Sequence, residues 1–205
     1  QVLNVPYDVP ANQFMNLEGQ AMSGSRNWAV WGRDFLTRYD PDALRYYLTI
    51  NMPENRDNHW YWDDFLARNN NELVANWGNL ANRVLSFAHK HWEGVVPTPN
   101  DLRPADEEII ALIEAGFEKV GALYEAVKIR PALQETLRLA SEVNKYLDQA
   151  APWKEFKVDK AAAGTTIFVA LRGIDSLKTL FAPVLPFTSE TLNGYFGAEQ
   201  PLFGE

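Results

Sequence analysis

Cysteine is absent from the 205-residue sequence, which excludes disulfides, thiolate metal sites and a cysteine nucleophile. Long apolar runs are absent too: none approaches the ~18 residues of a membrane-spanning helix, and residues 1–4 do not resemble the start of a signal peptide. The chain has three histidines, and His89 and His91 are two residues apart and so would not share a helix face; we therefore expect no metal site. These absences favour a protein of the reducing cytoplasm without a membrane partner.

Positive charge is also in short supply. The chain has 19 basic and 27 acidic side chains, which give a net charge of −8. This balance argues against binding to nucleic acid through a bulk positive field, so any contact with RNA must be local, and we expect none with DNA. Hydrophobic residues make up 46% of the chain, enough to build a core without disulfides or a metal.

The first part of the chain, residues 1–60, has a mixed texture. The sequence predicts a short strand at residues 13–15 that enters a hairpin. Further on, Asp40 and Pro41 predict the start of a short helix, because an acidic cap followed by proline is typical of helix N-termini. Pro53 ends this helix.

From residue 61 onward, apolar residues recur at the three- and four-residue spacing of amphipathic helices. The second of these stripes includes Phe117 and Val127 as expected core residues. Short connections between helices predict an antiparallel bundle. We therefore predict a mainly α fold, in which a helical domain of residues 61–205 follows the mixed segment. Its helices are expected at about residues 62–90, from 104 to 127, from 131 to 151, 160–181 and 192–196.

Polar residues form a second strip on the first long helix. Glu72, Asn76, Asn79 and Arg83 recur at spacings of four, three and four, so Asn79 and Arg83 point the same way. An amide and a guanidinium on one face can read the polar edge of a nucleobase. The alternative is a solvated helix flank that makes hydrogen bonds to neighbouring helices.

Two further features could bind RNA or phosphate. Trp153 follows the third helix and is preceded by Pro152, so it could offer a rigid π face to an unpaired base, or it could cap the core of the bundle. Residues 19–26 form a Gly/Ser-rich loop whose hydroxyls and amides could meet phosphates, although by composition alone they are only a loop.

Five blocks of sequence, in this order, resemble the C-terminal half of the methionyl-tRNA synthetases, a family of class I aminoacyl-tRNA synthetases. The resemblance covers nearly the whole chain, and the ordered set is more specific than any single motif. The blocks are residues 22–26, 28–36, 39–48, 69–83, and 144–148 followed by 152–153.

The resemblance implies the end of a catalytic Rossmann domain, a signature loop and a stem-contact region over residues 1–60, followed by an anticodon-binding helical bundle over residues 61–205. The family's upstream ATP motif and methionine pocket are missing, and the chain begins at Gln1. We therefore expect a fragment that binds tRNA without catalysis and without a cofactor of its own. Residues 1–60 should then be less ordered, with Phe14, Trp28 and Trp31 exposed.

In the full-length enzyme, the resemblance implies that methionine and ATP, with Mg²⁺, form methionyl-adenylate, and that the methionyl group passes to the methionine tRNA with anticodon CAU. Asn79 and Arg83 match the family's readers of the first anticodon base, a cytosine. Trp153 matches the aromatic residue that stacks on this base, and Pro152 the residue that sets the tryptophan.

The signature loop departs from the family. Its catalytic positions Met22, Ser23, Ser25 and Arg26 are retained, and the two lysine positions are occupied by Ala21 and Gly24. Those lysines bring positive charge to the ATP phosphates during adenylation. Two hypotheses therefore stay open: a working ligase, or a non-catalytic synthetase-like RNA-binding paralogue. A purely structural bundle would leave the combination of Asn79, Arg83 and Trp153 unexplained.

Overall fold

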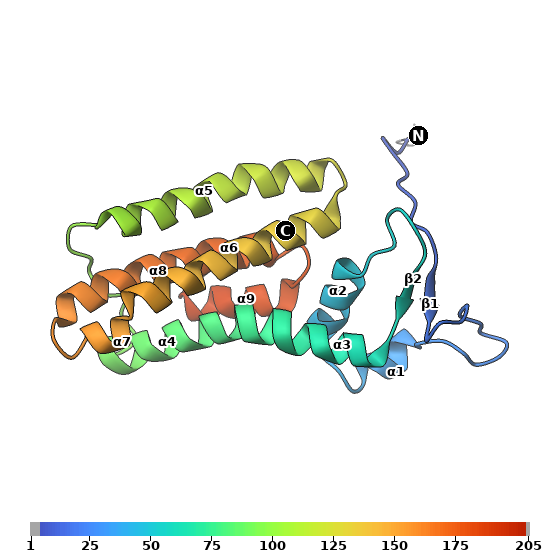
Figure 1. Ribbon diagram of the computed structural model, residues 1–205, viewed down its shortest axis with the longest axis horizontal. Helices are drawn as coiled ribbons and strands as arrows, with labels where there is room; N and C mark the ends of the chain where they lie inside the picture. The colour runs from blue at the N-terminus through green and yellow to red at the C-terminus, as the bar shows by residue number, and fades with distance from the viewer. Residues whose placement is uncertain (1–4, 204–205) are drawn as a thin grey trace.

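The computed structural model describes residues 5–203, most of which lie in helices (Figure 1). Three long helices pack against one another along their lengths and form the centre of a bundle. A shorter helix at the C-terminal end packs on this group; it begins at Pro186, earlier than the start expected at residue 192. The predicted mainly α bundle is confirmed. Its helices are α5 (Pro104–Glu125), α6 (Ile129–Ala150), α8 (Lys160–Phe181) and α9 (Pro186–Tyr195).

One long helical rod runs along the side of this bundle (Figure 1). It consists of α3 (Trp62–Arg68), a π-helical segment η1 (Asn69–Gly78) and α4 (Asn79–Trp92). The sequence predicted a single α-helix at residues 62–90. The structure differs in its middle part, where η1 has the wider turns of a π-helix. The apolar residues Leu73, Trp77, Leu80 and Val84 nevertheless face the bundle core on both sides of Gly78, as their spacing predicted. No helix of the described residues is long and apolar enough to cross a membrane.

The bundle core is dense where helices approach closely. A Cβ atom on Gly116 of α5 would lie 2.5 Å from the Leu139 side chain of α6, so a larger residue there would require Leu139 to move. Because Gly116 takes the core-facing position, its neighbour Phe117 turns outward and is 38% exposed. Val127 lies after the end of α5 with a positive φ of 55° and is also exposed. The prediction that Phe117 and Val127 belong to the core was therefore wrong.

The mixed segment has its own small core around a two-stranded sheet. Strand β1 (Met15–Leu17) pairs in parallel with β2 (Asn58–Trp60), so the strand expected at residues 13–15 is shifted and its sheet partner is distant in sequence. Leu17 also forms two backbone hydrogen bonds with Gln20, which close a tight turn as a hairpin would. Two helices complete the segment: α1 (Gly32–Leu36) and α2 (Pro41–Ile50), the latter capped by Asp40 as predicted.

Residues 5–14 lie outside any helix or strand, and Phe14 is 75% exposed. Trp31 is exposed as expected, whereas Trp28 is half-buried and its indole donates to the Leu17 carbonyl. We expect the amides of residues 5–14 to exchange with solvent with little protection, because few of them are hydrogen-bonded. Hydrogen exchange read by mass spectrometry checks this, and protection as strong as that of α8 would contradict it.

Candidate nucleic-acid interface

Arg83 and Trp153 meet at one end of the bundle. Helix α6 ends at Ala150, and Ala151 turns the chain with a left-handed backbone, φ 43°. Pro152 then begins the short helix α7 (Pro152–Glu155), which fixes the direction of Trp153. The Arg83 guanidinium of α4 lies over the indole of Trp153, with its central carbon 4.5 Å from the ring centre. The structure thus brings the first long helix and the end of α6 together.

Two residues of α6 hold the Arg83 guanidinium. Its two terminal nitrogens donate to Asp148 and Asn144, each at 3.3 Å, while its Nε is buried without a partner. The side chain of Asp148 is 67% exposed, and ion pairs of this kind contribute little stability. Arg83 is therefore positioned without being locked in place.

The expected polar strip divides into two halves. Glu72 accepts a hydrogen bond from Tyr46, and the amide of Asn76 donates to the Leu137 carbonyl and to Ser141. These residues of η1 thus make helix–helix hydrogen bonds, as the structural alternative predicted. Asn144 also donates to Asn76 at 3.0 Å and so links this network to Arg83.

Asn79 belongs to the other half of the strip. It is the first residue of α4, one helical turn before Arg83, and its side chain is exposed. Within residues 5–203, the Asn79 side chain forms no hydrogen bond that would occupy its amide. Asn79 and Arg83 thus lie one turn apart on the same face of α4, and Asn79 is exposed there.

Trp153 combines the two alternatives considered for it. Its indole packs against the bundle core and meets Phe87 edge-on at 6.3 Å between ring centres, so it covers that end of the core. The side chain is nevertheless only half-buried, whereas Pro152 is buried. Trp153 is therefore both a structural cap and an accessible ring.

An ion pair between a buried carboxylate and a partly exposed arginine, which the sequence did not predict, supports this end of the bundle. Asp106 is fully buried and accepts hydrogen bonds from Arg103 and from the hydroxyl of Tyr146. Burial opposes ionisation of Asp106, yet the bonds from Arg103 and Tyr146 outweigh it and hold the pKa of this carboxyl below its usual range. Arg103 also reaches Glu155 of α7 and Thr166 of α8.

The loop of residues 21–26 lies beside β1, at the end of the molecule opposite α7 (Figure 1). Ser23 and Trp28 exchange backbone hydrogen bonds that close the loop. The hydroxyls of Ser23 and Ser25 lie 3.2 Å apart, and Arg26 donates to the Ala21 carbonyl. The loop is therefore an exposed turn that carries two hydroxyls and one guanidinium.

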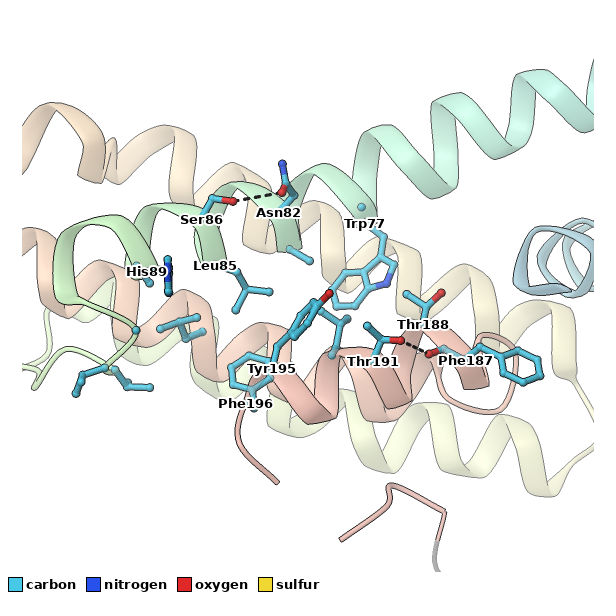
Figure 2. Close-up of a pocket in the computed structure, with 18 of the residues that line it drawn as sticks. Trp77, Asn82, Leu85, Ser86, His89, Phe187, Thr188, Thr191, Tyr195 and Phe196 are labelled. Carbon is cyan, nitrogen blue, oxygen red and sulfur yellow. Dashed lines mark hydrogen bonds between the residues drawn. The ribbon is translucent and has the colours of Figure 1, made fainter. Parts of the chain in front are cut away.

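A cavity of about 700 Å³ lies on a different side of α4 (Figure 2). Figure 2 shows Leu85 and His89 of α4 on one side and Tyr195 and Phe196 near the end of α9 on the other. Its lining does not include Arg83 or Trp153. In the described part of the chain, no group of three or more His, Asp or Glu side chains is placed to hold a metal ion.

Comparisons with known proteins bear on both parts of the chain. A family described as class I tRNA synthetases (M) matches residues 1–85. The anticodon-binding domain of methionyl-tRNA ligase matches residues 96–203, more than half of the chain. The chain belongs to the methionyl-tRNA synthetase family.

Relatives within this family are similar over nearly the whole chain. The methionine–tRNA ligase of Thermomicrobium roseum is 55% identical over 203 residues, which cover 99% of this chain and 35% of that protein. The ligase of Roseiflexus castenholzii is 53% identical over 202 residues, 97% of this chain and 34% of its own length. The chain thus spans about a third of the length of these relatives.

Solved structures of the family share the fold. Methionyl-tRNA synthetase of Mycobacterium tuberculosis in complex with methionyl-adenylate is 26% identical, with a TM-score of 0.81. The similar region covers 89% of this chain and 36% of the chain of that enzyme. The ligand-free form of that enzyme gives a TM-score of 0.82 at 26% identity, over 94% of this chain and 38% of its own.

Proposed function

We propose that this chain is the tRNA anticodon-binding part of a methionine–tRNA ligase, and that Asn79, Arg83, Pro152 and Trp153 form its site for the first anticodon base. The observation that carries the proposal is the stacking of Arg83 on Trp153, with the exposed Asn79 one helical turn before Arg83. The whole protein would attach methionine to a tRNA with anticodon CAU in the cytoplasm. By itself the chain would bind this anticodon without catalysis.

Hydrogen-bond chemistry supports cytosine as the base that is read. The Watson–Crick edge of cytosine presents O2 and N3 as neighbouring acceptors, which an amide and a guanidinium can satisfy as donors. Uracil presents an N3–H donor at one of these positions. Asn79 and Arg83 would therefore match both acceptors of cytosine, whereas with uracil one of their donors would face the N3–H donor of the base.

Arg83 must move when the base binds. Stacked planes lie ~3.5–4 Å apart, so a guanidinium and a base on opposite faces of Trp153 would be separated by about 7–8 Å. That separation is too large for a hydrogen bond. A base that stacks on Trp153 and is read by Arg83 therefore takes the place of the guanidinium, which swings to the edge of the base.

Replacing Trp153 by alanine tests the stacking role. We expect an anticodon stem-loop with CAU to bind about 1–3 kcal/mol more weakly, because one stacking platform is lost. Fluorescence anisotropy of labelled RNA measures the affinity. Trp31→Ala is the matched control, since Trp31 is exposed and lies near the distant loop. A large fall in thermal stability with unchanged RNA affinity would instead make Trp153 only a cap of the core.

The loop of residues 21–26 would contact ATP in the full-length enzyme. Its Ser23 and Ser25 hydroxyls and Arg26 guanidinium are groups that bind phosphate oxygens, so the loop fits ATP with one cation in place of three. ATP, with Mg²⁺, would supply the activated adenylate. We propose that Arg26 is the loop's remaining charge for the phosphates.

The missing lysines favour a second candidate, a non-catalytic RNA-binding paralogue. Methionine-dependent exchange of pyrophosphate into ATP by the full-length protein separates the two. The ligase function predicts measurable exchange that rises roughly 10²-fold when Ala21→Lys and Gly24→Lys restore the charge. Gly24 can accept this change, because an added Cβ would lie no closer than 3.6 Å to Trp31. If neither the wild-type protein nor the variant with both lysines restored exchanged pyrophosphate into ATP, the paralogue would be favoured.

A further inference from the structure

A group of aromatic side chains continues from Trp153 along the end of α4. Phe87 bridges them, 6.3 Å from Trp153 and 5.7 Å from Phe156 between ring centres. His91 lies 4.5 Å from Phe87 and 4.3 Å from Phe156, and Trp92 lies 5.5 Å from Phe156. All of these rings are partly exposed. We call Phe87, His91, Trp92 and Phe156 the α4–α7 aromatic face.

Unpaired lysines border this face. Lys154, Lys157 and Lys160 lie within seven residues of one another, and all three are exposed. None forms an ion pair with any residue of the described chain, whereas lysines elsewhere in the bundle, such as Lys119 and Lys145, do. The amino group of Lys160 lies 5.6 Å above the Trp92 ring and 5.7 Å above the Phe156 ring.

The acidic residues between these lysines are already occupied. Glu155 is paired with Arg103, and Asp159 accepts hydrogen bonds from two backbone amides at the start of α8. Residues 154–160 thus carry three lysines against two carboxylates, one of which is already paired with Arg103, so the segment keeps a net positive charge. In a chain whose net charge is −8, this is the kind of local positive patch that RNA binding requires.

We infer that the α4–α7 aromatic face, together with Lys154, Lys157 and Lys160, binds the single-stranded RNA that continues from the base held at Trp153. A flanking base stacks on the exposed part of Phe156 and His91, and the lysines meet the phosphates on either side. The inference rests on the proposed function, because the RNA strand must start at Trp153. Double-stranded RNA does not fit this surface, since its bases are already stacked on one another.

Salt dependence tests the phosphate contacts. Affinity for RNA falls as salt is added, and each lysine that contacts a phosphate of a single strand makes the negative slope of log K against log salt concentration steeper by about 0.7. Lys160→Gln should therefore lower the magnitude of this slope by about 0.7 for the CAU stem-loop, and the change of all three lysines to glutamine should lower it by about 2. Lys128→Gln is the matched control, because Lys128 is exposed at the other end of the bundle.

Paired changes in protein and RNA test the stacking. Phe156→Leu keeps an apolar side chain and removes the aromatic ring, so affinity for the CAU stem-loop should fall roughly tenfold. An RNA that is abasic at the nucleotide stacked there should bind the wild-type chain and the Phe156→Leu variant with the same affinity. Stem-loops abasic at each position next to the first anticodon base identify that nucleotide.

Two outcomes would overturn the inference. One is a slope of log K against log salt concentration that is the same for Lys160→Gln as for Lys128→Gln. The other is a Phe156→Leu loss that persists with every abasic RNA, which would make the ring merely structural. Failure of the proposed function looks different: the wild-type chain would not bind the CAU stem-loop, or Trp153→Ala would not weaken the binding.

Discussion

Replacing Asp106 by alanine is expected to lower the free energy of unfolding by about 3 kcal/mol, the lower end of the range for breaking a buried pair. Asp106 is fully buried, and its removal leaves the hydroxyl of Tyr146 and the guanidinium of Arg103 without their partner. Arg103 is 41% exposed, so water compensates part of the loss. Urea denaturation followed by circular dichroism measures the change.

Glu107→Ala is the matched control for this variant. Glu107 lies in the same first turn of α5 but is exposed, so its removal should cost less than about 1 kcal/mol. Equal losses for the two variants would show that the charge near the helix end matters and the buried pair does not.

The stability difference should also depend on pH. The pKa of Asp106 is held below its ordinary value of 3.8 in the folded chain. The stability that its ionised form contributes is therefore complete above this value and is lost as the pH falls through the lower, folded pKa. We expect wild type and Asp106→Ala to differ fully at pH 7 and to converge below about pH 4. A difference that stays constant down to pH 2 would contradict this origin.

Replacing Arg83 by alanine is expected to weaken binding of a stem-loop with anticodon CAU by about 1–3 kcal/mol, by analogy with base-edge contacts in DNA. The same change should hardly affect the already weak binding of a stem-loop with UAU, because the guanidinium has no matched acceptor pair there. Fluorescence anisotropy with two RNAs that differ only in the first anticodon base measures both affinities.

Arg172→Ala serves as the control, since Arg172 is an arginine of α8 that pairs with Glu114 of α5. Equal losses on the CAU and UAU stem-loops would make Arg83 a phosphate contact. If Arg83→Ala changed neither affinity, Arg83 would belong to a solvated helix flank that only holds Asn144 and Asp148.

Helix positions were predictable where local chemistry marks them. Apolar stripes indicated α5 and α8, and the Asp40 cap marked the start of α2. The π-helical turns of η1 were not predictable, because apolar spacing alone does not distinguish them from α-helical turns. The parallel pairing of β1 with β2 depends on contacts across about 40 residues, which local patterns do not encode.

The candidate site was predictable in part. Spacing placed Asn79 and Arg83 on one face, and the resemblance of the sequence to the family indicated Trp153 as their neighbour. The stacking of Arg83 on Trp153 and its contacts with Asn144 and Asp148 arise only when α4 and α6 pack together. The Arg103–Asp106 pair could have been found from the sequence, since an acidic residue three positions after a helix cap is typical of a capping box.

The most direct test of how the first anticodon base is read is a crystal structure of the chain bound to an anticodon stem-loop with CAU. We expect the first anticodon base to stack on Trp153, and the Arg83 guanidinium to leave the indole and donate to the edge of the cytosine beside Asn79. A complex in which Arg83 still covers Trp153 while the cytosine lies elsewhere would contradict this expectation.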